Sequence, residues 1–165
     1  MKKQFLFLIV FFSLISCQED VKFNNPAFQG VKDNVFWRAV QTTARVNSGG
    51  LLIIEAYTAT EVITLKTNSV AVGTYFIGTT PTSTATYVMT DPVTKEDIMF
   101  SSGSLGSPDS DTGNGQIEIT EYDDVNKTIS GTFKFNLENT FDNPLAGPTL
   151  NFQYGVFYKV PVTVQ

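Results

Sequence analysis

Apolar and polar residues alternate along much of the chain, most clearly between residues 116 and 137. In the run 116–122, Ile117 and Ile119 alternate with polar side chains, and after the Asp/Asn-rich segment 123–127 the alternation resumes. The residues that share the apolar face of the second run are Ile129, Gly131, Phe133, Phe135 and Leu137. Two such runs joined by a short turn predict a β-hairpin, because successive strand side chains point to opposite faces. We expect the apolar faces of both runs to lie in the core.

Shorter alternating runs, separated by Gly, Pro, Ser and Asn, predict further strands. They cover residues 35–40, 51–57, 61–66, 72–77, 84–89, 97–101, 150–154 and 156–164. After residue 16 the chain contains 21 Thr and 15 Val but only 7 Leu and 8 Ala, which favours strands over helices. The predicted fold class is all-β, a single antiparallel β-sandwich or partly open β-barrel of roughly eight to ten strands. Pro161 predicts an edge or a bulge in the last run.

The amino terminus has the features of a secretory signal peptide. Lys2 and Lys3 precede an apolar run at 5–15, which is too short for a membrane-spanning helix of about 20 residues. The segment 14–17, Leu-Ile-Ser-Cys, resembles the bacterial lipobox. The resemblance implies that diacylglycerol is attached to the thiol of Cys17 and that the chain is cleaved just before this residue.

The expected organisation is a lipoprotein signal peptide at 1–16, a lipidated amino terminus and tether at 17–32, and an all-β domain at 33–165. In lipoproteins of the Bacteroidota, an acidic patch after the cysteine, like Gln18-Glu19-Asp20 here, resembles a signal for the outer face of the outer membrane. The alternative is that these residues are simply a solvated tether. The expected location is the cell envelope, where the protein is an outer-membrane lipoprotein. Which face of the outer membrane it occupies is left open.

Composition narrows the chemistry that the domain can perform. The absence of histidine excludes imidazole as base, nucleophile or metal ligand, and the single cysteine excludes a disulfide framework. Without Lys2 and Lys3, the chain has 9 basic and 16 acidic side chains, a formal charge of −7, and no basic cluster for nucleic acid. We expect no cofactor and no nucleic-acid partner.

The segment 102–115 is the longest irregular connection and the expected contributor to a binding surface. Asp109, Asp111 and Asn114 match part of the calcium-loop pattern if Gly113 is skipped as an insertion. However, the residues after Gly115 are predicted to form a strand, where a calcium hand needs a helix. A solvated connection is therefore favoured, and calcium binding stays the weaker option.

A lone tryptophan and a pair of glutamates are the other candidates for binding or catalysis. Trp37 could stack on a sugar, but a lone tryptophan in a strand is more often a core residue, and this is the expectation. Paired carboxylates can hydrolyse glycosidic bonds without histidine. Glu118 and Glu121 lie three apart on one predicted strand, which places them on opposite faces. We expect no catalytic residues.

The segments 115–135 and 155–162, with Phe36-Trp37-Arg38-Ala39 and Gly73-Thr74-Tyr75, are similar to a family of small flavobacterial lipoproteins catalogued only as a domain of unknown function. The resemblance covers most of the mature chain. It implies a lipid-anchored β domain in the cell envelope and offers no catalytic residues.

Three hypotheses of function remain. The first is a non-catalytic binding module, whose partners are the membrane, through lipid on Cys17, and either an envelope protein or a small ligand such as a glycan. The second is a structural or accessory subunit of an envelope complex. The third is a carboxylate-based hydrolase.

Overall fold

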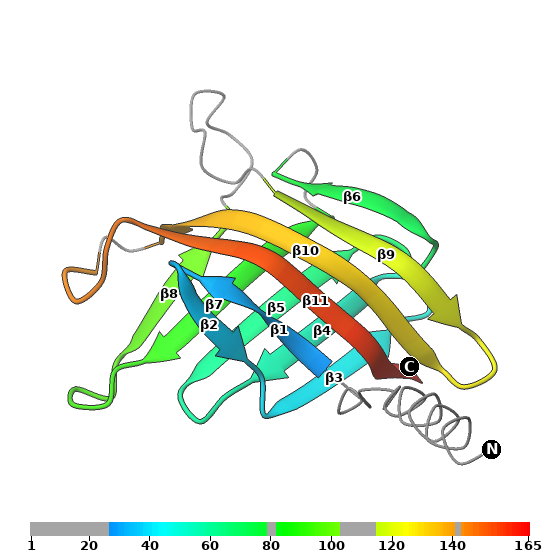
Figure 1. Ribbon diagram of the computed structural model, residues 1–165, viewed down its shortest axis with the longest axis horizontal. Helices are drawn as coiled ribbons and strands as arrows, with labels where there is room; N and C mark the ends of the chain where they lie inside the picture. Colours follow the sequence, from blue (N-terminus) through cyan, green and yellow to red (C-terminus); the bar gives the residue numbers. More distant parts are fainter. Residues whose placement is uncertain (1–26, 79–81, 103–114, 141–142) are drawn as a thin grey trace, which may run out of the picture.

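Strands form all the regular structure in residues 27–78, 82–102, 115–140 and 143–165, which are the residues described by this computed structural model (Figure 1). The strands are β1 (Ala27–Lys32), β2 (Val35–Arg38), β3 (Gln41–Val46), β4 (Leu52–Tyr57), β5 (Glu61–Thr67), β6 (Gly73–Ile77), β7 (Thr84–Thr90), β8 (Asp97–Ser101), β9 (Gly115–Asp123), β10 (Thr128–Asn139) and β11 (Thr149–Val164). No helix occurs among these residues, and the predicted all-β class is confirmed.

The strands pair as one large, mostly antiparallel sheet in the order β2-β1-β11-β3-β4-β5-β7-β8-β10-β9-β6. Strand β11 pairs parallel with the end of β3 and antiparallel with β10, and the second pairing closes the row of strands on itself. Closure is incomplete, because only Glu138 and Asn139 of β10 pair with β8. In Figure 1, β9, β10 and β11 cross in front of β3, β4 and β5. The architecture is a partly open barrel with two layers of strands.

Inward-facing side chains of both layers form one apolar core. Four phenylalanine rings at its centre, Phe28, Phe133, Phe135 and Phe152, contact one another with centroids 4.7 to 5.6 Å apart. The hairpin residues predicted to be buried, Ile117, Ile119, Ile129, Phe133, Phe135 and Leu137, are each at most 2% exposed. Their predicted core position is confirmed. Trp37 is 5% exposed, so its predicted core position is also confirmed.

The structure differs from the sequence prediction at three places. Residues 27–32, assigned to the tether, form β1 and pair with β11, so the β domain begins at Ala27 and the boundary at residue 33 is wrong. Strand β3 was not predicted, because only Ala44 and Val46 of this largely polar strand are buried. The two runs at 150–154 and 156–164 are one strand, β11.

The missed strand β1 contains Gly30, a residue that weakens any strand prediction. Here the glycine has a packing reason, because a Cβ at this position would lie 2.5 Å from the ring of Phe152. In β11, the predicted irregularity near Pro161 takes the form of a bulge. The register against β10 shifts just before Val160, and Lys159 has a φ of 48°.

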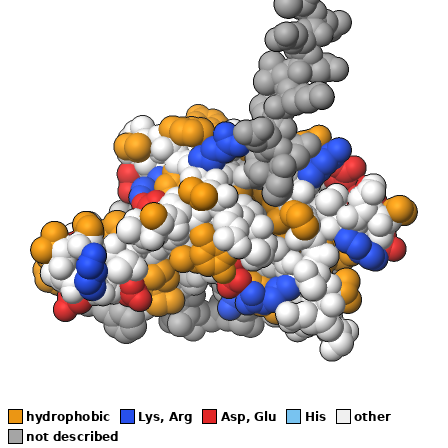
Figure 2. Space-filling view, turned by 90° about the horizontal axis from the view of Figure 1, so that it is seen from below, with side chains coloured by type: hydrophobic (Ala, Val, Ile, Leu, Met, Phe, Trp, Pro, Cys, Tyr) orange, Lys and Arg blue, Asp and Glu red, His pale blue; other side chains and the backbone are white. Residues whose placement is uncertain are grey.

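The outer surface carries hydrophobic side chains in scattered positions. Figure 2 shows one face, on which they lie in several separate groups among charged and other polar side chains. The described part of the chain contains no helix that is long and apolar enough to cross a membrane.

Candidate functional site

The β9–β10 hairpin places polar side chains on the outer face of the sheet. Its turn is stabilised by Asp123, whose carboxylate accepts hydrogen bonds of 2.9 Å from the backbone N–H groups of Val125 and Asn126. These bonds, the one from Asn126 foremost, hold the pKa of Asp123 below its usual value. In the register that this turn sets, Gln116 lies opposite Lys134. Both side chains point away from the core, because their strand neighbours are buried.

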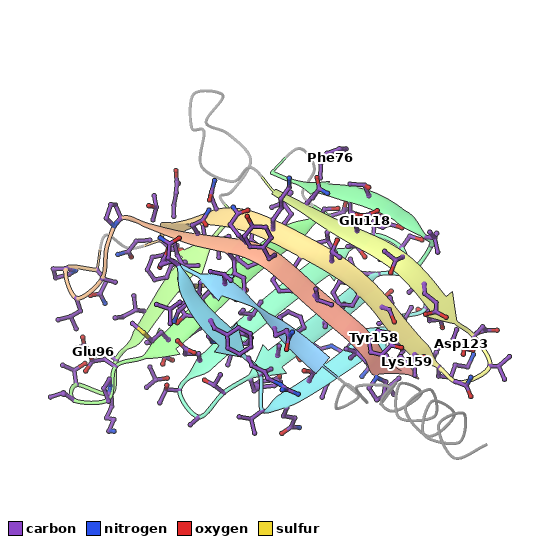
Figure 3. All side chains as sticks on the ribbon, viewed as in Figure 1. Phe76, Glu96, Glu118, Asp123, Tyr158 and Lys159 are labelled. Carbon is purple, nitrogen blue, oxygen red and sulfur yellow. The ribbon has the colours of Figure 1, made fainter. Side chains whose placement is uncertain are left out.

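The Gln116–Lys134 pair belongs to a row of side chains that crosses four strands. On β6, Phe76 lies opposite Gln116, and Figure 3 shows it at the outer edge of the sheet. On the other side, the part of β11 that passes Lys134 carries Gln153 and Tyr154. We call these five residues the outer row.

A β-bulge in β11 turns Tyr154 outward. Tyr154 has a φ of 52°, its side chain is 82% exposed, and the register of β11 against β10 shifts at this point. The next residue, Gly155, has no room for a side chain, because a Cβ there would lie 2.5 Å from the ring of Phe133. The bulge therefore presents Tyr154 to solvent while Phe133 fills the core directly beneath, and bulges of this kind often re-aim a side chain at a binding site.

On each side of the outer row, one pair of polar side chains forms a hydrogen bond. A neighbouring row consists of Thr74, Glu118, Thr132 and Val156. In it, the hydroxyl of Thr132 donates a hydrogen bond of 3.3 Å to the carboxylate of Glu118, which is labelled in Figure 3. On the opposite side, the amide of Asn151 donates to Asn136.

Two adjoining clefts, of about 380 Å³ and about 480 Å³, open over the outer row. Gln116, Lys134 and Gln153 line both clefts, with Phe76 in the first and Tyr154 in the second. Within the described part of the chain, these three central side chains have no hydrogen-bond or ion-pair partner. Amides both donate and accept, and an ammonium group donates, so the row offers unused polar groups to a ligand.

A second polar cluster lies inside the domain. The carboxylate of Glu61 on β5 accepts hydrogen bonds from Lys32, from the indole N–H of Trp37 and, at 2.5 Å, from the hydroxyl of Tyr87. Lys32 also donates to the hydroxyl of Tyr87 at 2.7 Å, and its Nζ lies 4.9 Å from the centre of that ring. We call these four residues the interior cluster.

The hydrogen bonds of the interior cluster decide its protonation. Burial acts to raise the pKa of Glu61, but hydrogen bonds from Lys32, Tyr87 and Trp37 outweigh it and hold this pKa below its usual value. Burial, followed by the hydrogen bond to Glu61, raises the pKa of Tyr87 far above its usual range. At neutral pH the cluster therefore holds an ionised Glu61 and a neutral Tyr87. Both carboxylate oxygens already accept protein hydrogen bonds, so the cluster stabilises the fold rather than offering a base to a substrate.

The residues proposed as sites from the sequence fall largely elsewhere. Cys17, Asp109, Asp111 and Asn114 lie outside the described residues, so lipidation and the weaker calcium option stay predictions. Of the expected binding loop, residues 103–114 also lie outside, although Gly115 at its end lines the first cleft. The part of the chain that is described contains no group of three or more His, Cys, Asp or Glu side chains placed to hold a metal.

Sequence analysis missed both the outer row and the interior cluster. The signal for the first was the polar face of the predicted hairpin, where Gln116 and Lys134 alternate with core residues. The signal for the second was Glu61, a carboxylate in phase with the buried Ile63 and Leu65 of the same strand.

Fold and site together define a small all-β domain with a two-part cleft on its outer face. A family model described as "Domain of unknown function (DUF6252)" matches residues 24–161, and the chain belongs to this family. The match begins before β1, in agreement with the earlier start of the domain. No curated protein and no solved structure matches the chain.

Proposed function

We propose that this protein is a non-catalytic binding module of the cell envelope and that the outer row is its binding surface. The observation that carries the proposal is the contrast between Gln116, Lys134 and Gln153, which have no partner among the described residues, and the neighbouring pairs Glu118–Thr132 and Asn136–Asn151, which bond to each other. Ligand sites combine a concave surface with a few well-placed polar groups and aromatic side chains. The outer row has this composition, with Tyr154 supplying an exposed aromatic ring.

The envelope location rests on the lipobox-like segment that ends at Cys17. Each buried methylene of an attached lipid contributes about 0.8 kcal/mol to membrane binding, so a doubly or triply acylated cysteine is a stable anchor. Replacing Cys17→Ser should release the protein from membranes or leave the precursor uncut. A variant that is processed and fractionates like the parent would contradict the anchor.

The chemistry of the clefts supports binding over catalysis. Glycoside hydrolysis without histidine needs two carboxylates about 5–10 Å apart on either side of the bond. The described residues that line the two clefts include no Asp or Glu. Turnover of a glycan or peptide by the purified protein, abolished by one Asp or Glu substitution, would favour the hydrolase instead.

The proposal is tested by capture from intact envelopes with matched variants. The tagged full-length protein is recovered under membrane-preserving conditions as the parent, as Gln116→Ala/Gln153→Ala, and as the control Thr64→Ala/Lys66→Ala. The control pair faces outward on β5, away from the clefts. Loss of the same bound molecules from the first variant alone supports the proposal. Equal recovery with all three proteins would favour an accessory subunit that binds through another surface.

A further inference from the structure

The charge and shape of the outer row indicate a ligand class, and this inference rests on the proposed function. We propose that the clefts bind an acidic oligosaccharide, with one sugar ring stacked on Tyr154 and a sugar carboxylate paired with Lys134. Three features of the described residues lead to this class: an exposed aromatic platform, amides beside a lone cation, and two adjoining clefts that share three side chains.

Tyr154 provides the platform. Its ring is 82% exposed, and the backbone bulge that presents it is fixed by the packing of Gly155 on Phe133. Tyrosine gives a large amphipathic contact area at little cost in conformational entropy. The weakly polar C–H groups on one face of a sugar ring pack well on such a ring, while the hydroxyl groups at the sugar's edge stay free to form hydrogen bonds.

The centre of the row fits hydroxyl groups and one negative charge. Gln116 and Gln153 can each donate and accept, as sugar hydroxyls also do. Lys134 lies between them as an exposed ammonium group without an ion-pair partner in the described part of the chain. The nearest carboxylate in the register, Glu118, lies in the neighbouring row, where it faces Thr132 and accepts a hydrogen bond from its hydroxyl. A ligand carboxylate therefore finds a positive partner at Lys134 and amide donors on both sides.

The arrangement favours an elongated ligand over a single sugar. Neighbouring strands lie about 4.8 Å apart, so a row across four strands spans roughly 14 Å. The two clefts, of about 380 Å³ and about 480 Å³, share Gln116, Lys134 and Gln153. Consecutive sugar units can occupy them while both units contact the shared side chains.

A peptide is the main competing ligand, and the position of the row disfavours it. Extended peptides gain affinity by pairing their backbone with an open sheet edge. Phe76, at one end of the row, lies on the edge strand β6. The central residues lie on β9, β10 and β11, each of which already pairs on both sides. Only side chains are offered there, which suits a ligand recognised through its hydroxyl groups and charge.

The test measures binding of defined oligosaccharides to the full-length protein in detergent by calorimetry. The probes are galacturonic acid oligomers of three to six units and cellulose-derived oligomers of the same lengths, the latter uncharged. We expect tighter binding of the acidic series, with an affinity that falls as salt is raised because Lys134 is exposed. Lys134→Met should weaken the acidic series about tenfold and leave the uncharged series unchanged.

A second variant tests the platform, with controls for both changes. Tyr154→Asn removes the ring but tolerates the positive φ at this position, and it should weaken both series. The controls are Lys66→Met on β5 and Phe36→Ala on β2, a 64% exposed ring away from the clefts, and neither should alter binding. Unchanged thermal unfolding of each variant shows that the fold is retained.

Each contrary outcome has a distinct meaning. Equal binding of both series with no effect of Lys134→Met overturns the acidic class but leaves a binding module. Failure of both series to bind overturns the oligosaccharide, and if Gln116→Ala/Gln153→Ala still loses its captured molecules, the proposed function stands and a peptide becomes the next ligand to test. If, in addition, Gln116→Ala/Gln153→Ala captures the same molecules as the parent, both proposals are overturned.

Discussion

The interior cluster and the outer row contain similar chemical groups, and they differ in whether the protein itself satisfies them. Glu61 and Lys32 are both largely buried, and each bonds to Tyr87 as well as to the other. Lys134, by contrast, is exposed and has no such partner within the described residues. A buried charge without partners destabilises the fold, so buried polar groups need hydrogen-bond partners within the protein. An exposed charge is hydrated by water and costs little without a protein partner. The interior cluster therefore serves stability, and the three central side chains of the outer row stay available to a ligand.

The largest expected effect comes from removing a core residue directly beneath the outer row. Phe133 lies next to Lys134 in the chain and beneath the bulge of Tyr154. Phe133→Ala should lower the free energy of unfolding by about 3–5 kcal/mol, because it leaves a cavity among packed rings. Urea denaturation measures the change. A loss below about 1 kcal/mol would mean that this ring does not hold the two layers together.

Breaking the interior cluster should have the next largest effect. Glu61→Gln preserves the size of the side chain but removes the charge that accepts from Lys32, Trp37 and Tyr87. We expect the free energy of unfolding to fall by about 1.5–3 kcal/mol, the range for hydrogen bonds to a charged group. Binding by the outer row should be unchanged. A variant that unfolds at the parent's urea concentration would show that the cluster is not stabilising.

The same cluster predicts a dependence of stability on acid. The folded pKa of Glu61 lies below its value in the unfolded chain, about 4.3. Its contribution is therefore fully present above that value and is lost as pH falls through the lower folded pKa. Urea midpoints measured from pH 6 downward should decline less steeply for Glu61→Gln than for the parent. The decline of the urea midpoint that remains in Glu61→Gln comes in part from Asp91 and Asp123. Their pKa values are also lowered, first of all by backbone hydrogen bonds.

A change at Gly155 should affect the core and the outer row together. In Gly155→Ala the new Cβ meets the ring of Phe133 at 2.5 Å, so either the ring or the bulge must move. Overpacking of this kind typically costs about 1–3 kcal/mol. We also expect weaker ligand binding, because Tyr154 shifts with the bulge. Gly49→Ala is the control, since the nearest atom to its Cβ is 3.4 Å away on an exposed side chain.

The hairpin could be predicted from the sequence, but the outer row could not. Local signals, the alternation of Ile117, Ile119 and Phe133 and the Asp/Asn turn, determine the hairpin and its buried face. The row depends instead on the register between strands that are distant along the chain, and on a bulge at Tyr154, which the sequence indicated only as a break at residue 155 between two predicted strands. A one-residue shift in any of these pairings would move its side chains to the other face.

The interior cluster was hidden for the same reason. Glu61 alone is an ordinary charged residue at the start of a strand. Its partner Lys32 lies 29 residues earlier, in a segment that the sequence pattern assigns to the tether. Nothing in the sequence pattern links the two. Only the sheet order, which brings both strands to the same interior, makes the pair visible.

The smallest expected effect comes from Glu55→Gln, which is the matched comparison for Glu61→Gln. Glu55 on β4 also pairs with a cation, Arg45 of β3, at 2.6 Å. The Arg45 side chain is 39% exposed, against 20% for Lys32, and Glu61 also accepts hydrogen bonds from Trp37 and Tyr87. Exposed ion pairs contribute about 0–1 kcal/mol, because water screens the charges and both side chains lose freedom on pairing. Glu55→Gln should therefore change the free energy of unfolding by less than about 0.5 kcal/mol in urea denaturation. If instead it costs as much as Glu61→Gln, the distinction between satisfied interior groups and available exterior ones does not hold for this protein.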